Sequence, residues 1–218
     1  GAAAADSARA FLAPVNSTAT GLTAVAGAAT PVATAVAVGG NAGATFTLTN
    51  GADNLVGDGG NNTFNGYVNT TAATAATSTL TAADAITGGA GVDTLAIVVD
   101  GALAGSLPNA TITGVENFSI RDVAGAASVY NFANVEGEAK VTSNVSINAG
   151  GVTFQNLGTN TVVAVQGNNS AQVANVTFNM ATATDAVNLV LNGGLKGATL
   201  VANTAGAATA ATISSTGA

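Results

Sequence analysis

Cysteine and histidine are absent from the 218 residues, and charged and aromatic side chains are scarce. These absences exclude disulfides, thiol nucleophiles, His-based catalytic triads and most zinc and copper sites. Charged residues make up 7% of the chain, whereas an ordinary globular domain carries roughly 25%. The mean hydropathy is +0.45, the opposite of the hydrophilic, highly charged composition of disordered chains. We therefore expect a folded protein with one large domain or two small ones.

The few charges are unequal in sign, with eleven acidic and four basic residues and a net charge of -7. Without a basic stripe to hold phosphates, nucleic-acid binding is not expected, and the acidic balance favours divalent cations instead. Thr, Asn, Ser, Gly and Pro interrupt every apolar stretch, so no run reaches the ~18 residues of a spanning helix. We predict no membrane span.

Candidate catalytic groups are also few. An enzyme would need paired carboxylates or a nucleophile beside a base. In VEGEAK (135–140) we interpret Glu136, Glu138 and Lys140 as a structural ion pair on a solvated strand face, with a second cation site or a catalytic pair as the alternatives. The charges of ENFSIRD (116–122), namely Glu116, Arg121 and Asp122, are interpreted as a local cluster. No phosphate-binding loop is present, so we expect a protein that is not an enzyme.

The composition and pattern of the chain change near residue 45. Residues 1–44 are Ala-rich and low in complexity, which predicts a small cap or a linker. From Thr45 onward, short β-like runs alternate polar and apolar residues between Gly, Asn or Asp turns, and from about residue 110 they recur mostly every 9 to 13 residues. Even spacing of this kind is typical of a sandwich, a barrel or a solenoid.

Three features favour the solenoid. Aromatic residues are too few for a sandwich core, the strands are short and rich in Thr and Asn, and small residues dominate the expected inward positions. We predict an all-β fold, a right-handed parallel β-solenoid (β-helix). Its expected parts are a calcium β-roll over 45–100, with an inserted loop at 67–80, and further coils over 101–218.

The roll is predicted from a repeated nonapeptide. The stretch NGADNLVGDGGNNTFNG (50–66) and the stretch ADAITGGAGVDTLA (83–96) each follow GGxGxDxUx, where U is a large apolar residue. Asp53 and Asn62 are nine residues apart, as are Asp84 and Asp93, and an apolar residue lies two places after each. Glycines in such turns expose carbonyls, and Asp adds the hard oxygen that Ca²⁺ prefers.

Successive coils of a roll bring alternate turns together. We therefore expect Asp53 to share an ion with Asp84, and Asn62 to share a weaker one with Asp93, because Asn lacks the charge. The turn carbonyls and one further carboxylate would complete the calcium sites, namely those of Gly51, Gly57, Asp58, Gly60, Gly88, Gly89 and Gly91. The alternative is that these are ordinary Asp-Gly and Asn-Gly hairpin turns without metal.

The order of these motifs resembles a known family. A nonapeptide pair, an Ala/Thr-rich loop, ADAITGGAGVDTLAIVV (83–99) and LPNATITGVENFSI (107–120) look like the repeats-in-toxin (RTX) type surface-layer (S-layer) proteins of alphaproteobacteria. The clear resemblance covers about residues 48–123. The chain has fewer repeats than the family and ends without its C-terminal secretion segment, so we expect a fragment of a longer protein.

The resemblance implies a structural cell-surface protein that is exported by type I secretion and self-assembles with calcium into an extracellular lattice or filament. Its partners would be copies of itself and cell-surface polysaccharide. The alternative is an RTX adhesin, or a non-catalytic calcium-folding module of a larger secreted protein. An adhesin module would stay monomeric when calcium is added, whereas a lattice protein would form ordered particles.

Overall fold

The protein is described by a computed structural model over residues 43–71, 77–101, 110–168, 174–182, 186–195, 199–203 and 211–216. Its regular structure in these ranges is almost entirely β. The strands are β1 (Thr45–Thr47), β2 (Asn54–Val56), β3 (Thr63–Asn69), β4 (Ala85–Thr87), β5 (Thr94–Asp100), β6 (Thr111–Thr113), β7 (Asn117–Asp122), β8 (Ser128–Asn131), β9 (Lys140–Asn144), β10 (Val152–Leu157), β11 (Val162–Gln166), β12 (Val176–Met180), β13 (Val187–Asn192), β14 (Leu200–Asn203) and β15 (Ala211–Thr216).

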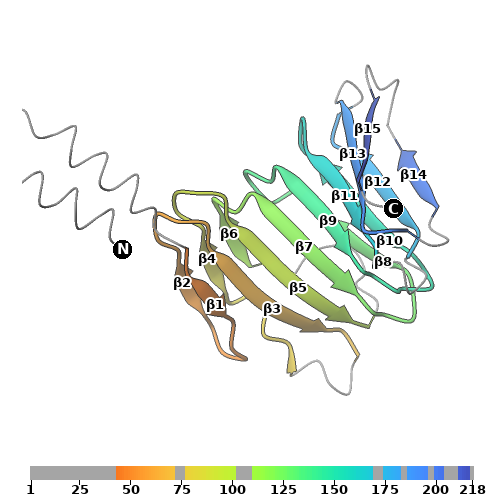
Figure 1. Ribbon diagram of the computed structural model, residues 1–218. Coiled ribbons are helices and arrows are strands. Elements are labelled where there is room, and N and C mark those ends of the chain that lie inside the picture. The colour runs from red at the N-terminus through yellow and green to blue at the C-terminus, as the bar shows by residue number, and fades with distance from the viewer. Residues whose placement is uncertain are drawn as a thin grey trace, which may run out of the picture. The chain divides into compact units, whose positions relative to one another are not determined.

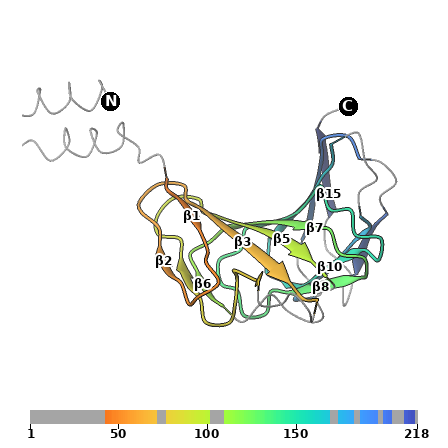
Figure 2. The same ribbon diagram turned by 90° about the horizontal axis from the view of Figure 1, so that it is seen from below.

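The strands alternate between two faces as the chain advances (Figures 1 and 2). One face is an eight-stranded sheet with the order β1-β3-β5-β7-β9-β11-β13-β15. The other face consists of a three-stranded sheet, β2-β4-β6, and a four-stranded sheet, β14-β12-β10-β8. Neighbouring strands pair in parallel, which requires a crossover through the opposite face each time. The all-β class and the parallel β-solenoid are confirmed, and the right-handed sense stays a prediction.

The register explains the spacing that the sequence shows. Thr45 pairs with Thr63, so the first coil advances by 18 residues, which is two nonapeptides. Thr94 pairs with Asn117, and Asn117 with Lys140, so these two coils advance by 23 residues each. The next two coils advance by 22 and 26 residues, because Lys140 pairs with Val162 and Val162 with Asn188. The longer coils keep two strands and lengthen their connections, so the nonapeptide pattern disappears while the stacking continues.

The core between the two faces is built from large side chains. The prediction that small residues dominate the inward positions is wrong. The largest fully buried side chains include one tyrosine and five phenylalanines, namely Tyr130, Phe64, Phe118, Phe132, Phe154 and Phe178. Because equivalent positions stack in register, a few aromatics suffice: Phe46 stacks on Phe64 with ring centroids 4.9 Å apart, and Tyr130 pairs with Phe154 at 5.7 Å.

One buried carboxylate lies at a corner of the core. Asp122 is 0% exposed and accepts hydrogen bonds from the Tyr130 hydroxyl at 2.8 Å and from the Ala124 amide at 2.8 Å. The interpretation of Glu116, Arg121 and Asp122 as one charge cluster is therefore wrong. Side chains alternate along β7, which turns Asp122 inward and leaves Arg121 exposed.

Replacing Tyr130 by Phe is expected to cost about 1–3 kcal/mol, because a buried carboxylate would lose a donor. Burial, together with the charge and hydrogen bond of Asp122, raises the pKa of the Tyr130 phenol above its ordinary 10.0. The folded state thus favours the neutral phenol, so this contribution is complete below about pH 10 and declines as the pH rises further. Urea denaturation at about pH 8 and pH 10.5 measures both effects.

The matched control is Tyr67→Phe. The Tyr67 hydroxyl lies 3.4 Å from the exposed Asp100 carboxylate and accepts a hydrogen bond from Asn69 Nδ2 at 3.2 Å, so its loss should cost about 1 kcal/mol or less. Equal costs for the two variants at pH 8 would contradict a stabilising role of the Asp122–Tyr130 pair. The difference between the two variants in free energy of unfolding should become smaller above pH 10. If it does not, the raised pKa of Tyr130 is contradicted.

Two predicted segments lie partly outside the described residues. Of the expected cap or linker at 1–44, the structure describes only residues 43 and 44. The insert expected at 67–80 begins later, because β3 continues through Asn69 and pairs there with Asp100 of β5. Residues 72–76 are not described. Within the described part of the chain, no helix has the length and hydrophobicity needed to cross a bilayer.

Candidate cation site at the stacked turns

Three residues occupy equivalent positions on one edge of the solenoid. Asn62, Asp93 and Glu116 immediately precede β3, β5 and β7, whose first residues pair with one another in register. Ala44 and Ala139 hold the same position before β1 and β9. The turns that lead into the eight-stranded sheet are therefore stacked, and the three polar residues follow one another along this edge.

Each polar side chain reaches back to the preceding coil. Asn62 Oδ1 accepts a hydrogen bond from the Ala44 amide at 2.8 Å, and Asp93 Oδ1 accepts one from the Asn62 amide at 2.6 Å. Glu116 Oε2 accepts one from the Asp93 amide at 2.8 Å. The carboxylates and the Asn carbonyl thus cap backbone N–H groups that precede each strand and join consecutive coils.

The amide group of Asn62 lies among oxygen atoms. Its Nδ2 is 2.8 Å from the Gly60 carbonyl, 3.1 Å from the Gly88 carbonyl and 3.4 Å from the Asp58 carbonyl. Asp93 Oδ1 lies 2.9 Å away. Asn62 is 1% exposed. Four oxygens from two adjacent turns therefore converge on one buried nitrogen, which carries only two hydrogens.

Asp93 lies one coil further along, at the equivalent position. It is 0% exposed, and its Oδ2 is buried with no hydrogen-bond partner. A Cβ added at Gly88 would lie 2.5 Å from this oxygen and would overlap the Gly114 carbonyl oxygen. A buried carboxylate oxygen thus faces a carbonyl across Gly88, and its charge lacks compensation on that side. Such an arrangement is costly without a cation or a donor.

The opposite edge holds the second predicted pair, Asp53 and Asp84, before β2 and β4. The Asp53 amide donates to Asp84 Oδ1 at 2.9 Å, and the Thr81 amide donates to Asp84 Oδ2 at 2.6 Å. The Asp53 carboxylate accepts from the Thr49 amide at 2.7 Å and from the Thr49 hydroxyl at 3.0 Å. All four carboxylate oxygens of this pair therefore have protein donors.

The turn glycines allow the coils to approach closely. A Cβ at Gly57 would overlap the Gly88 carbonyl oxygen, as one at Gly88 would overlap that of Gly114. Gly89 and Gly91 have φ values of 103° and 117°, and each lies against a carbonyl of the preceding turn. The remaining predicted ligands lie at the surface or within these turns: Gly51 and Asp58 are exposed and Gly60 is buried.

Asp53 is hydrogen-bonded to Asp84, and Asn62 to Asp93, as the spacing of the nonapeptides implied. Their role as calcium ligands stays a prediction, and no group of three or more Asp or Glu residues suited to a metal ion occurs among the described residues. Glu116 was missed. Its signal was the large apolar Phe118 two places later, the same offset that separates Asp93 from Leu95.

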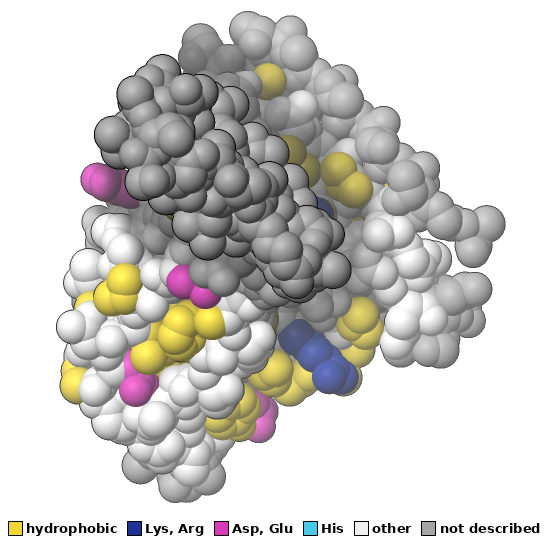
Figure 3. All heavy atoms as spheres, turned by 60° about the vertical axis from the view of Figure 1, so that its left-hand side comes forward, with side chains coloured by type: hydrophobic (Ala, Val, Ile, Leu, Met, Phe, Trp, Pro, Cys, Tyr) yellow, Lys and Arg dark blue, Asp and Glu magenta, His cyan; other side chains and the backbone are white. Residues whose placement is uncertain are grey.

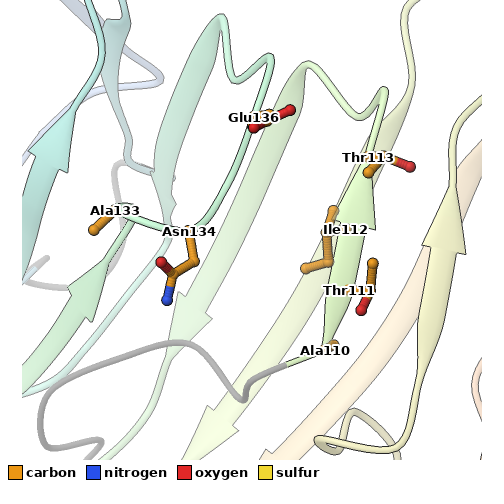
Figure 4. Close-up of a pocket in the computed structure, with 7 residues that line it drawn as sticks. All are labelled: Ala110, Thr111, Ile112, Thr113, Ala133, Asn134 and Glu136. Atoms are coloured by element: carbon orange, nitrogen blue, oxygen red, sulfur yellow. The ribbon is translucent and has the colours of Figure 1, made fainter.

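A groove lies where the smaller face is interrupted between β6 and β8. The groove, of about 590 Å³, is lined by Ala110, Thr111, Ile112, Thr113, Ala133, Asn134 and Glu136 (Figure 4). An isolated parallel bridge between Thr113 and Glu136 joins its two sides. Hydroxyl, amide and carboxylate groups thus border this groove.

Charged side chains are sparse on the surface shown in Figure 3, where acidic groups lie separately among polar and apolar atoms. No protein-family model matches the chain, and no curated protein or solved structure is significantly similar to it. The class of protein is therefore defined by the fold and its stacked turns: a parallel β-solenoid with acidic residues along its turn edges.

Proposed function

We propose that the chain is a structural subunit, or a fragment of one, of a calcium-dependent extracellular S-layer lattice or surface filament. In this role it is not an enzyme, it leaves the cell by type I secretion, and it contacts copies of itself and cell-surface polysaccharide. Calcium binds the turn edges and links coil stacking to the extracellular ion concentration. Extracellular calcium modules generally bind at ~10⁻⁴ to 10⁻³ M, which suits sites with few carboxylates.

The observation that supports this proposal most is the unpartnered, fully buried Oδ2 of Asp93 within a stack of glycine turns. A cation bound beside this oxygen would compensate its buried negative charge. Self-association is proposed through β1 and β15, the outermost described strands of the eight-stranded sheet. Terminal strands of a solenoid can pair with another copy when nothing caps them.

The second candidate is an adhesin or a calcium-folding module. The groove bordered by Thr111, Asn134 and Glu136 favours it, because hydroxyl, amide and carboxylate groups are the donors and acceptors that bind sugar hydroxyls. In this alternative, calcium still orders the turns, but the chain stays monomeric and the groove binds a glycan.

Calcium titration of the full chain separates the two candidates. Between about 10⁻⁴ and 10⁻² M calcium, the β-sheet signal in circular dichroism and the particle size in light scattering are expected to rise together. Asp93→Ala should reduce both changes, while Asp100→Ala, which alters an exposed carboxylate at the end of β5, should leave them intact.

An increase in β-signal without growth in particle size would favour the adhesin or module. No response of either signal to calcium would contradict the calcium proposal. Growth with magnesium at the same concentrations would show that general charge screening, and not selective calcium binding, drives association.

A further inference from the structure

The proposed calcium role raises the question of which turns bind the ion. The Asn62 turn, residues 57–62, and the Asp93 turn, residues 88–93, are six residues long and stack in register, 31 positions apart. Each residue of one turn thus has a counterpart in the other: Gly60 corresponds to Gly91, and Asn62 to Asp93. The two turns differ chemically at the position of the buried side chain.

In the Asn62 turn, the space among the oxygens already holds a donor. The Nδ2 atom lies 2.8 Å from Gly60 O, 2.9 Å from Asp93 Oδ1 and 3.1 Å from Gly88 O. A set of carbonyl and carboxylate oxygens around one point is what a calcium ion requires. Here a neutral amide N–H₂ group occupies that point and satisfies the oxygens without a metal.

In the Asp93 turn, the corresponding atom is an acceptor. Asp93 Oδ2 is the terminal atom that does not bond to Asn62, it is buried, and it has no partner. It lies against Gly88 together with the Gly114 carbonyl. The next residue in the stack is Glu116, whose Oε2 lies 2.8 Å from the Asp93 amide nitrogen. Two carboxylates and a carbonyl therefore belong to this step of the stack, where the Asn62 turn has an amide donor.

We propose that the side-chain amide of Asn62 takes the place of a cation in its own turn, and that the calcium ion binds one coil further, between Asp93 and Glu116. Asp93 Oδ2, the Glu116 carboxylate and the Gly114 carbonyl form the core of this site. The Asn62–Asp93 step is a metal-independent joint, and the Asp93–Glu116 step is a metal-dependent one. This inference rests on the proposed calcium role and does not depend on lattice formation.

The first test is the number of calcium ions bound by the full chain and its variants, measured by isothermal titration with calcium chloride. Glu116→Gln is expected to bind one calcium fewer than the parent, or to bind it at least about tenfold more weakly, because the site loses a charge. Glu138→Gln is the matched control. Glu138 Oε1 accepts a hydrogen bond from the Gly158 amide at 2.9 Å in a later coil, so its loss should not change calcium binding.

The second test is thermal unfolding in EDTA. Asp93→Asn gives the Asp93 turn the same amide that Asn62 provides in its own turn. The Tm of this variant without calcium is therefore expected to rise by about 2–6 °C, and calcium should no longer change it. Asn62→Asp creates a second acidic turn, so its Tm in EDTA should fall and calcium should restore it. The two substitutions are isosteric, which keeps the stacked turns intact.

Three results would overturn the inference: unchanged calcium binding by Glu116→Gln, a lower Tm of Asp93→Asn in EDTA, or no calcium binding by the parent at millimolar concentrations. Calcium binding with the expected variant effects, but without growth of particles, would overturn the lattice proposal and support the metal-dependent joint. The two proposals can therefore fail separately.

Discussion

Gly88→Ala is expected to destabilise the protein by about 3 kcal/mol or more, at the upper end of the cost of overpacking. The added Cβ would overlap the Gly114 carbonyl oxygen and would lie 2.5 Å from Asp93 Oδ2. The Gly114 carbonyl belongs to the adjacent coil, and Asp93 belongs to the same turn as Gly88. Relieving the overlap would therefore shift one coil against the other. Calcium binding at this turn should be lost together with stability.

The matched control is Gly59→Ala, in the neighbouring turn. No atom lies within 4 Å of a Cβ at Gly59, and its φ is not among the positive values. Because alanine restricts the unfolded chain more than glycine does, this variant should be neutral or stabilised by up to about 1 kcal/mol. Urea denaturation in the presence of calcium measures both variants. A similar cost for the two would contradict close stacking of the turns.

Phe118→Ala is expected to cost about 3–5 kcal/mol, the usual range for emptying an aromatic site in a core. Phe118 is 0% exposed and pairs in register with Leu95 on one side and Val141 on the other. Its ring also meets the edge of Phe132 with centroids 5.2 Å apart. The cavity would therefore lie between the two faces in the middle of the stack.

Val98→Ala is the control for Phe118→Ala. Val98 lies in β5, next to the strand that carries Phe118, and is 38% exposed. Its truncation should cost less than about 1 kcal/mol. Denaturation in urea gives the comparison directly, and since about 1 kcal/mol corresponds to ~2–4 °C in a domain of this size, thermal melting gives it independently. If Phe118→Ala costs no more than Val98→Ala, the stacked aromatic core is not what stabilises the coils.

The strands could be predicted well because their signals are local. Turn residues at Gly, Asn and Asp separate runs in which polar and apolar residues alternate, and the nine-residue offset of Asp53 and Asn62 gives the length of a half-coil directly. The same regularity predicted which residues become neighbours. Asp53 and Asp84 are 31 positions apart, yet they are hydrogen-bonded, because the insert adds length without shifting the register.

Two features of the core were missed. The sequence showed few aromatics, and the buried row of Phe64 and Leu95 was not extended to Phe118, although Phe118 lies two places after Glu116. Asp122 looked like a surface charge beside Arg121. Its burial follows only from its place at the inner side of β7, opposite the hydroxyl of Tyr130 on β8.

In the candidate site, too, the sequence determined one part and the tertiary structure another. The residue types and their spacing determined by themselves that acidic and amide side chains would recur in glycine turns along a solenoid edge, since a side chain's position in a repeat depends only on the periodicity of the chain. Which of those side chains has a partner was decided by tertiary structure. Asn62 donates to the oxygens around it, whereas Asp93 leaves one buried oxygen without a donor. Both side chains lie against a backbone carbonyl of the next coil, to which the Asn62 amide can donate and the Asp93 carboxylate cannot. That contact exists only between coils, so neither turn sequence by itself shows whether its side chain finds a partner.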